Sequence, residues 1–487
     1  MHLDRRTLIT GAAAVSAASL ISPERVWAAE AGAPADWALA VGDVEADIAP
    51  QAMRLLHGRP PPGLAGALYR VGPAKFRRGG EAAHWFDGDG LVRAFRLDGA
   101  GGATLAARFV DTPKRRADTA AGALVTPGFG TLGRPEASVR GPDDVNAANT
   151  AMLAVGDDLW ALWESGSPSA LDPKSLDSRG FVTLRDDAKG LPFLAHPKTE
   201  PGGRIWNLGV MGRRAVIWRL SASGAVEAAT TLTLPRASYI HDFTATDREL
   251  VILLQPWVQS GFRAPLAAGM DWKPELGTQV LVVDKSDLTR SRTYELPAFF
   301  FFHLGDAWRE ADGTIRFDGC LAKDAGFVTH DIARMTAAKT FKATPPNAAM
   351  IALHPDGRGV VDYTSRTAEF PRTDPRFAGR PRRYTWHVTG ESADRPLSRA
   401  IGVTDWVGGR TVTHDFGARQ ISEEAVFVPR PGSSAEGDGW LVGSTLNLAA
   451  QATELHVFDA LRLADGPLCS WRAQAALPVG FHGVFVG

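Results

Sequence analysis

The segment Phe299-Phe300-Phe301-Phe302-His303-Leu304-Gly305 ends a run of four phenylalanines with a histidine. Three other histidines lie in similarly short apolar or aromatic segments, namely Phe193-Leu194-Ala195-His196-Pro197, Ser238-Tyr239-Ile240-His241-Asp242-Phe243 and Gly480-Phe481-His482-Gly483. Neutral imidazole is the commonest protein ligand for transition metals. Four such ligands from distant segments need a fold that gathers them at one point, and this gathering is our functional hypothesis.

Each of these histidines has an alternative interpretation when taken alone. A single histidine between apolar residues is more often a hydrogen-bonded core residue than a metal ligand. As a group the four differ from six histidines in polar or mixed surroundings, namely His2, His57, His330, His354, His387 and His456. His84 and His414 are exceptions, since each precedes a phenylalanine by two residues and lies near an aspartate. Composition alone does not choose between a core and a ligand role.

Short apolar segments between turn residues dominate the chain. The 487 residues include 51 glycines and 32 prolines, and the intervening segments are rich in Val, Leu, Thr, Phe and Trp. This pattern predicts many strands and turns. Buried strands are predicted at Leu159–Trp163, Ala215–Trp218, Leu250–Leu254 and Gln279–Val283. The best helical pattern, near Asp331–Lys342, is short, so an all-β fold is favoured over an α/β sandwich.

The spacing of the candidate ligands favours a β-propeller. His196 and His241 are 45 positions apart, and His303 follows His241 by 62 positions. A four-stranded propeller blade takes roughly 40–50 residues. The innermost strands of a propeller surround a central channel. One histidine per blade would therefore converge on the axis, although no exact short repeat recurs along the chain.

The overall composition argues against two classes of chemistry. The chain has 53 basic and 54 acidic residues and no basic stripe with interleaved aromatics, so no nucleic-acid partner is expected. Cys320 and Cys469 are the only cysteines, so no disulfide framework supports the fold and thiolate metal chemistry is disfavoured. Whether these two cysteines form a single bridge stays open.

The first residues have the pattern of a targeting segment. Asp4-Arg5-Arg6-Thr7-Leu8-Ile9 opens an apolar stretch that runs to Ile21, and Val26-Trp27-Ala28 is typical of a cleavage site. The stretch is too short to span a bilayer, and the paired arginines are similar to a twin-arginine signal. We predict a signal peptide over residues 1–28 and a periplasmic protein. An uncleaved amphipathic anchor is the weaker alternative, because Ala12–Ala18 lacks a charged face.

Several further motifs follow one another in a fixed order. They are Gly63–Pro73, His84–Gly90, Arg108–Thr112, Ala148-Asn149-Thr150, Leu162-Trp163-Glu164, Gly277–Val280, Glu369–Arg372, Glu424–Pro429 and Gly437–Trp440. By itself, Asp87-Gly88-Asp89-Gly90 predicts a tight turn, and we assign both aspartates to that turn. Together with the four histidine segments, the set resembles the carotenoid cleavage oxygenase family from about Gly58 to residue 487.

The resemblance implies a fold and a metal site. It implies a seven-bladed all-β propeller with a dome of loops and short helices over an axial metal, formed by one domain over residues 58–487 after an N-terminal extension at 29–57. Fe(II) would be held by His196, His241, His303 and His482. Glu164, Glu369 and Glu424 fall where the family has carboxylates that bind the outer ring N–H of these ligands. Thr150 matches a threonine whose side chain leans over an open coordination position.

The resemblance also implies a reaction. The expected enzyme is a non-heme iron dioxygenase that uses O₂ to cleave one C=C bond of a lipophilic carotenoid or apocarotenoid into two carbonyl products. Phe299–Phe302, Trp257 and Phe262 are candidate lining groups, with core packing as the alternative for most of them. The segment from Trp257 to Met270 is a candidate for peripheral membrane contact. The sequence predicts neither the cleaved bond nor the oligomeric state.

Departures from the family pattern bear on the substrate. The family has asparagine where Val71 and Asp306 stand, but neither position is expected to touch iron. Stilbene-cleaving relatives recognise a phenol with a lysine and a tyrosine, at places that correspond to Val145 and Phe109. Deprotonating a 4-hydroxystilbene needs a polar partner, which these residues cannot supply. A carotenoid or apocarotenoid is therefore favoured, and a stilbenoid stays an alternative.

Three rival functions remain. The chain could cleave a stilbenoid or phenylpropanoid alkene, it could be an isomerising or ligand-binding propeller that keeps the iron site, or it could be a metal-free scaffold. Dependence on O₂ and bound iron separates these alternatives.

Overall fold

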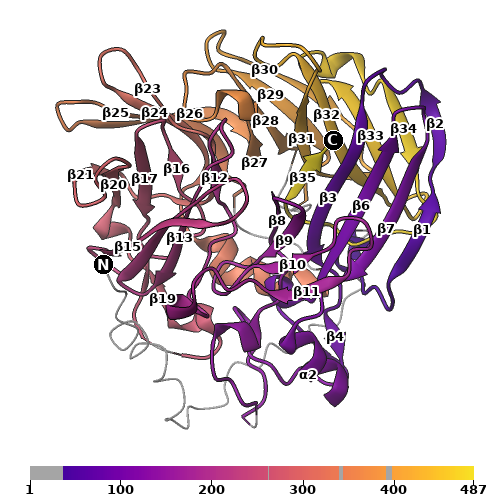
Figure 1. Cartoon of the computed structure of the whole chain (residues 1–487), viewed down its shortest axis with the longest axis horizontal. Coiled ribbons are helices and arrows are strands. Elements are labelled where there is room, and N and C mark those ends of the chain that lie inside the picture. The colour runs from indigo at the N-terminus through magenta and orange to yellow at the C-terminus, as the bar shows by residue number, and fades with distance from the viewer. Residues whose placement is uncertain (1–36, 136, 262, 339–343, 391–396) are drawn as a thin grey trace.

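Seven sheets of four or five antiparallel strands surround one central axis (Figure 1). The computed structural model describes residues 37–487 except 136, 262, 339–343 and 391–396. Neighbouring sheets touch through their innermost strands, which contact one another around the axis as β22 with β27, β27 with β31, β31 with β35, and β35 with β8. This is the seven-bladed propeller that the sequence predicts.

The blades are numbered here in the order in which the ring follows the chain. Blade 1 consists of β1 (Ile48–Ala52), β7 (Ala103–Phe109), β6 (Gly90–Asp98), β3 (Ala65–Pro73) and β35 (Gly483–Val486). Blade 2 consists of β11 (Ser178–Phe181), β10 (Ser169–Leu171), β9 (Asp158–Leu162) and β8 (Ala151–Val155). Blade 3 consists of β12 (Lys198–Thr199), β13 (Ile205–Met211), β14 (Arg214–Leu220) and β15 (Val226–Thr233). Blade 4 is β16 (Thr244–Ala245), β17 (Glu249–Leu254), β20 (Thr278–Asp284) and β21 (Ser291–Leu296).

The remaining sheets complete the ring. Blade 5 is β22 (Phe300–Leu304), β24 (Ile315–Ala322), β25 (Asn347–Leu353) and β26 (Gly359–Thr367), with β23 (Trp308–Arg309) beside β24. Blade 6 is β27 (Glu369–Arg372), β28 (Tyr384–Thr389), β29 (Ala400–Asp405) and β30 (Arg410–Asp415); blade 7 is β31 (Gln420–Pro429), β32 (Gly439–Asn447), β33 (Ala452–Asp459), β34 (Cys469–Arg472) and β2 (Arg54–Gly58). Two small hairpins, β4 (Arg77–Arg78) with β5 (Glu81–Ala82) and β18 (Trp257–Gln259) with β19 (Met270–Trp272), lie outside the ring sheets.

The two ends of the described chain close the ring at two places. β35 pairs with β3 at the inner edge of blade 1, and β2 pairs with β34 at the outer edge of blade 7. β1 and β2 already belong to blades, so the strands of the ring begin before the boundary expected at Gly58. Both are short edge strands with mostly exposed side chains, so they lack the apolar alternation that makes a strand visible in a sequence.

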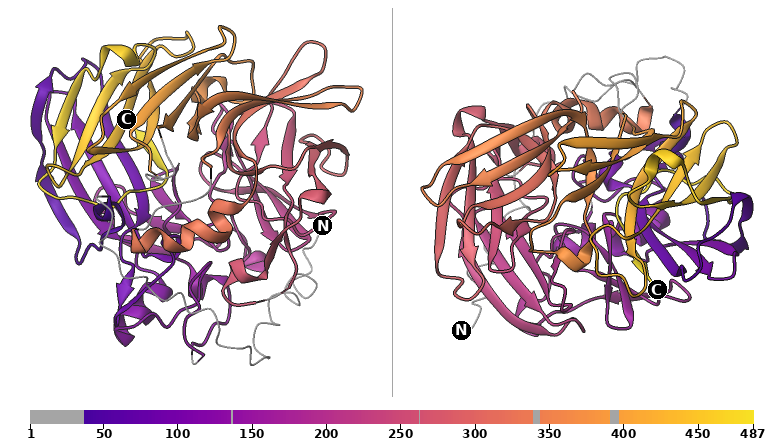
Figure 2. Two further views of the ribbon diagram at one scale, coloured as in Figure 1. Left: turned by 180° about the vertical axis from the view of Figure 1, so that it is seen from behind. Right: turned by 90° about the horizontal axis from the view of Figure 1, so that it is seen from above.

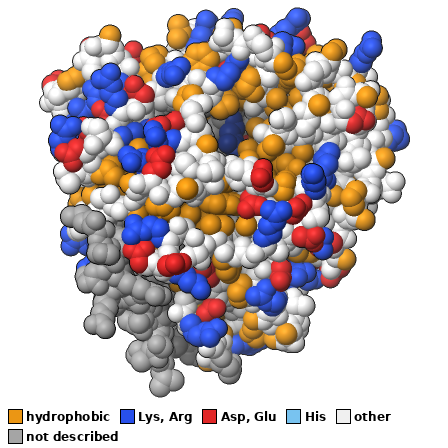
Figure 3. Space-filling model, in the orientation of Figure 1, with side chains coloured by type: hydrophobic (Ala, Val, Ile, Leu, Met, Phe, Trp, Pro, Cys, Tyr) orange, Lys and Arg blue, Asp and Glu red, His pale blue; other side chains and the backbone are white. Residues whose placement is uncertain are grey.

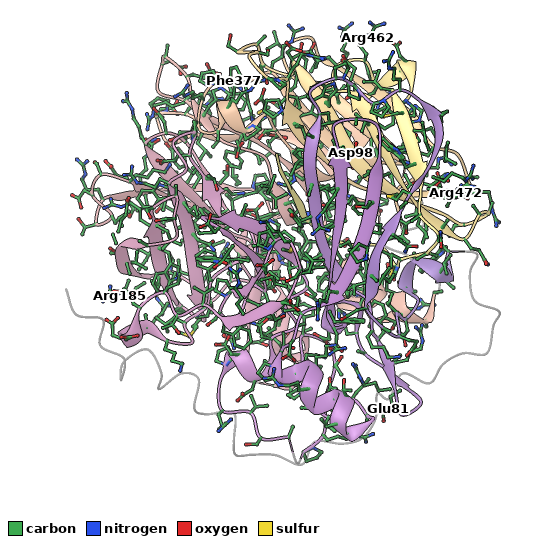
Figure 4. All side chains as sticks on the ribbon, turned by 45° about the vertical axis from the view of Figure 1, so that its right-hand side comes forward. Glu81, Asp98, Arg185, Phe377, Arg462 and Arg472 are labelled. Atoms are coloured by element: carbon green, nitrogen blue, oxygen red, sulfur yellow. The ribbon has the colours of Figure 1, made fainter. Side chains whose placement is uncertain are left out.

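Buried strands hold each blade to its neighbours. The four strands predicted from apolar segments are confirmed as β9, β14, β17 and β20. Side chains of adjacent blades share apolar clusters, such as Trp160 of blade 2 with Val216 and Trp218 of blade 3. Burying a large apolar side chain contributes roughly 1.5–3 kcal/mol, so the ring is stabilised mainly by these contacts. Figure 4 shows side chains filling the space between the sheets, whereas Arg185 and Arg462 lie at the periphery.

Loops and short helices cover one end of the ring as the expected dome. α2 (Pro113–Ala121) begins where the Thr112 side chain accepts a hydrogen bond from the Arg115 backbone N–H, and it ends at Gly122, whose φ of 60° suits glycine. Short helical turns over Phe327–Asp331 and Ile332–Ala337 cross the middle of the left view in Figure 2. The helix expected near Asp331–Lys342 begins earlier, and its end falls partly outside the described residues.

Asp87 and Asp89, assigned to a turn from the sequence, also bind residues of the dome. Asp87 accepts hydrogen bonds from three successive backbone N–H groups, those of residues 129–131. Asp89 accepts one from Lys114 of α2, and both carboxylates are almost fully buried. The pair therefore fastens the dome to the start of β6, which a tight turn alone would not require.

Two further expectations concern crosslinks and membranes. Cys320 lies in β24 and Cys469 in β34, strands of two different blades, so no bridge joins them. Within the described ranges, no helix combines the length and the apolar character needed to cross a bilayer.

Candidate metal centre

Four blades each bring one histidine to the axis of the ring. His196 and His241 lie in the turns that lead into β12 and β16, His303 lies within β22, and His482 immediately precedes β35. One ring nitrogen of each lies within 4.8 Å of those of the other three. The Nε2 atoms of His196 and His241 are 2.9 Å apart, and those of His482 and His303 are 3.0 Å apart. The structure thus gathers all four candidate ligands at one focus.

These separations fit a first-row transition metal. Two nitrogen ligands about 2.1 Å from an ion and at right angles to each other lie about 3.0 Å apart, which matches the two Nε2–Nε2 distances above. Two ligands opposite each other would be about 4.2 Å apart, inside the limit of 4.8 Å. An all-imidazole set suits iron, copper, nickel or zinc better than magnesium or calcium, which prefer oxygen.

Three of the four rings are fixed from behind by a carboxylate. The Nδ1–H of His241 donates to Glu164 at 2.5 Å, that of His303 to Glu369 at 2.5 Å, and that of His482 to Glu424 at 2.8 Å. Because Nδ1 carries the proton, the lone pair of each Nε2 faces the common centre. Each of the three glutamates named from the sequence therefore binds the outer ring nitrogen of one candidate ligand.

His196 differs from the other three histidines. Among the described residues, no carboxylate binds its ring. Burial, reinforced by the neighbouring imidazoles of His482, His241 and His303, holds the pKa of His196 well below its usual range. Burial also lowers the pKa of His482 to about 3. Both rings are thus neutral near pH 7, which is the form that binds a metal.

Tyr239 is a site residue that the sequence reasoning did not single out. Its hydroxyl donates to Glu164 at 2.8 Å, and its ring stacks at 6.1 Å on that of His241, two residues along the chain. Burial and the adjacent Glu164 carboxylate raise the pKa of Tyr239 well above its usual value, so it stays a donor. A tyrosine two positions before a candidate ligand was the available signal.

Arg372 is the second site residue that was missed. Its Nε and Nη2 atoms donate to the two oxygens of Glu424 at 2.7 and 3.0 Å, and Nη2 also reaches the Gly483 carbonyl at 2.8 Å. Burial opposes ionisation of Glu424, but Arg372 and His482 outweigh it and hold the pKa of this carboxyl below its usual range. The motif Glu369–Arg372 contained this arginine, but nothing local connects it to Glu424, 52 residues later.

Phe370 adopts a backbone conformation that is rare for its residue type. Its φ is +54°, although it carries a bulky side chain and precedes a proline. Its ring stacks on His303 at 4.9 Å and tilts against His482 at 5.0 Å. Its backbone N–H donates to Glu369 at 2.9 Å. Such a conformation costs about 1–3 kcal/mol and persists where the surroundings impose it, here beside two candidate ligands.

Thr150 immediately precedes β8 and contacts one candidate ligand, His482. Its carbonyl accepts the backbone N–H of His482 at 3.2 Å, and its hydroxyl donates to the Asn149 side chain at 3.1 Å. The role expected for its side chain over an open coordination position stays a prediction. With Thr150 included, every blade places one site residue at its inner strand: Thr150, His196, His241, His303, Glu369, Glu424 and His482.

Aromatic residues cover the histidines on the dome side. The four phenylalanines of residues 299–302 alternate between two environments. Phe300 and Phe302 belong to the apolar cluster under the dome, here called the dome cluster, which also contains Trp85, Phe129, Tyr239 and Trp257. Phe299 and Phe301 pack inside the blades. Phe302 lies 5.3 Å from the His241 ring, and Trp257 lies 4.8 Å from the Tyr239 ring. Phe262 falls outside the described residues. Phe299 and Phe301, two of the proposed lining residues, therefore serve the blade core instead.

The structure does not support one substrate argument made from the sequence. Phe109 packs in the apolar cluster of blades 1 and 7 with Leu91 and Leu105, and the Arg115 guanidinium lies 4.7 Å above its ring. It is not part of the dome cluster. Phe109 therefore does not discriminate between a phenol and a hydrocarbon, because it faces the core of its own blade.

The chain matches known proteins over almost its whole length. The family model described as retinal pigment epithelial membrane protein, RPE65, matches residues 43–487. The apocarotenoid-15,15'-oxygenase of Synechocystis is 28% identical over 92% of this chain and 94% of its own. The lignostilbene-alpha,beta-dioxygenase isozyme III of Sphingomonas paucimobilis is 27% identical over 88% of this chain and 92% of its own.

Solved structures agree with this match. The crystal structure of cobalt-substituted Synechocystis ACO superimposes with a TM-score of 0.85 at 25% identity and covers 93% of this chain and 98% of its own. The fold, the cluster of four histidines and the match to the family model indicate the same family. The chain therefore belongs to the RPE65 family, that of the carotenoid cleavage oxygenases.

Proposed function

We propose that this protein is an Fe(II)-dependent dioxygenase that cleaves one C=C bond of a carotenoid or apocarotenoid with O₂ to give two carbonyl products. The observation that carries the proposal is the convergence of four histidine nitrogens within 4.8 Å, three of them backed by carboxylates. The similarity to an apocarotenoid-15,15'-oxygenase supports the choice of substrate class.

The residues of the chain prepare the site for iron and for a hydrocarbon. Bound iron supplies the chemistry that activates O₂ beside the alkene. Glu164, Glu369 and Glu424 keep the proton on Nδ1 of their histidines, so each Nε2 stays available as a neutral donor. Four neutral donors leave the double charge of the ion uncompensated by its own ligands, which suits the binding of a polarisable, uncharged oxidant.

The dome cluster suits a conjugated alkene. Phe302, Tyr239 and Phe370 lie against the histidine rings, and further apolar side chains such as Trp257 and Phe300 surround them. Aromatic and aliphatic side chains bind a hydrocarbon by burial and exclude water from the reacting centre. The residues on this side therefore bind and orient the substrate while the glutamates act from the opposite side of the imidazoles.

The dependence on O₂ tests the proposed reaction. Iron-loaded protein incubated with apocarotenals in air is expected to form aldehyde fragments detectable by mass spectrometry, and no fragments under anaerobic conditions. A parallel incubation with hydroxystilbenes tests the alternative substrate class, which the similarity to a lignostilbene-alpha,beta-dioxygenase supports. Conversion that is indifferent to O₂ would instead indicate the isomerising alternative.

We also propose that the protein is exported through the twin-arginine route to the periplasm. The support is the pattern Arg5-Arg6 before an apolar stretch and the cleavage motif ending at Ala28, residues that lie outside the described structure. Fractionation of cells that express the full chain is expected to place it in the periplasm, with a mature N-terminus near residue 29. Replacing Arg5 and Arg6 with lysine should retain it in the cytoplasm, and equal export of this variant would contradict the proposal.

A weak membrane contact is proposed for two adjoining dome loops. Leu132 is 66% exposed and Leu266 is 41% exposed, and the backbone of residue 266 donates to the carbonyl of Gly128. Trp257, expected to take part, is instead fully buried. In co-sedimentation with phosphatidylcholine vesicles, the double substitution Leu132→Asp and Leu266→Asp should reduce bound protein several-fold. The exposed Val407 on the β29–β30 turn provides a matched control, since Val407→Asp should have no effect.

A further inference from the structure

The three carboxylates behind the candidate ligands differ in what else they bind. Glu164 accepts a neutral hydroxyl from Tyr239. Glu369 accepts the backbone N–H of Phe370. Glu424 alone accepts a charged group, the guanidinium of Arg372, in addition to the backbone N–H of Gly483 at 2.8 Å. The ligand set is therefore asymmetric in charge as well as in hydrogen bonding.

The formal charges of the site balance only when Arg372 is counted. The four imidazoles are neutral, a ferrous ion brings two positive charges, and three carboxylates bring three negative ones. Arg372 supplies the remaining positive charge, so the ferrous site and its directly bonded partners are neutral together. A ferric ion would raise the same assembly to a net charge of plus one.

Other charged groups near Arg372 do not replace it. Lys198 pairs with Asp242 at 2.8 Å, so these two cancel. Asp306 accepts a hydrogen bond from Thr373, and it contacts none of the ligand histidines in the part of the chain that the structure describes. Glu423, the neighbour of Glu424, is paired with Arg93 on the far side. Among the residues that the structure describes, Arg372 is thus the cation bonded directly to one of the three carboxylates.

The environment of the pair lets its charge act on the metal. The Glu424 side chain is 1% exposed, and the Arg372 side chain is 33% exposed. Figure 3 shows a hollow near the middle of one face with a basic side chain inside it. Water reaches the partly exposed Arg372 side chain. Screening by this water limits the electrostatic effect without removing it. The rigid two-pronged contact to both oxygens of Glu424 is a geometry that lysine cannot reproduce.

We propose that Arg372 is a positioning residue that keeps the bound iron in the ferrous state. The inference rests on the iron site of the proposed function. The guanidinium neutralises the third carboxylate, and without it the surroundings would carry one extra negative charge. That charge stabilises the ferric ion, which arises when the ferrous ion gives one electron to an oxidant. Net charge and hydrogen bonding around a metal are established determinants of its reduction potential.

The test measures oxidation of the iron and not cleavage of a substrate. Anaerobic, ferrous protein without organic substrate is mixed with ferricyanide, which accepts the one electron, and the ferric signal is followed by electron paramagnetic resonance. Arg372→Met is expected to oxidise about 10-fold faster than the wild type and to show a lower midpoint potential. Arg372→Lys, which keeps the charge, should fall near the wild type in potential.

A double variant separates a charge role from a merely structural one. Arg372→Met with Glu424→Gln removes one positive and one negative charge and restores neutrality. We expect its oxidation rate to return towards that of the wild type although both partners are gone. The proposal would be overturned if the double variant oxidised as fast as Arg372→Met or faster. It would also be overturned if the double variant lost as much of its iron as Arg372→Met.

Arg376 offers a matched control. It makes the same two-pronged contact, through Nε at 2.9 Å and Nη2 at 2.6 Å, to Asp374, a carboxylate that binds no ligand histidine. Arg376→Met should leave the oxidation rate unchanged, and an acceleration equal to that of Arg372→Met would overturn the proposal. If the wild-type protein binds no iron, the proposed function fails, whereas rapid cleavage with unchanged oxidation in Arg372→Met refutes this inference alone.

Discussion

His241→Ala is expected to yield a folded protein that retains little iron and has lost more than about 100-fold of its cleavage activity. The substitution removes a nitrogen 2.9 Å from that of His196 and leaves the Glu164 carboxylate with Tyr239 but without its imidazole. Loss of a group that only supports a ligand typically costs 10- to 100-fold, so loss of the ligand itself should cost more. Metal analysis of the purified protein and product analysis measure the two effects.

His387→Ala is the matched control for this substitution. His387 is also a buried histidine, but it lies in β28 and its Nε2 bonds to Thr404 at 3.0 Å within blade 6. Its replacement should lower the free energy of unfolding by about 1–3 kcal/mol and leave the iron content unchanged. Full retention of iron by His241→Ala would refute the four-histidine site and leave the scaffold interpretation standing.

Glu424→Ala should be the most damaging of the three carboxylate substitutions. Glu424 binds His482, Arg372 and the backbone N–H of Gly483, whereas Glu164 binds His241 and one hydroxyl. Its removal leaves a cation and an imidazole without their partner, at a cost of about 2–3 kcal/mol because Arg372 keeps some contact with water. We expect iron affinity to fall about 100-fold, against about 10-fold for Glu164→Ala.

Two measurements check this order. Iron affinity follows from competition with a chelator, and stability follows from denaturant unfolding of the metal-free proteins. Glu164→Ala is the matched control, since it also removes one carboxylate from behind one ligand. Equal losses in both variants would show that the additional partners of Glu424 contribute nothing to the site.

The parts of the fold that the sequence predicted are those with a local signature. The apolar segments at Leu250–Leu254 and Gln279–Val283 stand out because β17 and β20 are middle strands of blade 4, with most side chains on both faces buried. The four histidines stand out because each lies in a short apolar segment, and the spacing of the first three approximates one blade. The glutamates were located only through the family resemblance, because nothing near Glu369 or Glu424 in the chain indicates a partner.

The features that the sequence did not predict depend on contacts between distant segments. Arg372 acquires its role from Glu424, and Tyr239 acquires its role from Glu164, 75 residues earlier. β1 and β2 are exposed edge strands whose position is fixed by pairing with β7 and β34. Phe109 was assigned to the wrong environment because position in a motif does not determine which face of a strand a side chain occupies.

The order of the ligands along the chain has a consequence for biosynthesis. His196 leaves the ribosome long before His482, and at 5–20 residues per second the delay is about 15–60 s. The strand that follows His482 is also the one that pairs with β3 and completes blade 1. A nascent polypeptide therefore cannot offer the full set of nitrogen donors, and metallation must wait until synthesis has passed residue 482 and the ring has closed.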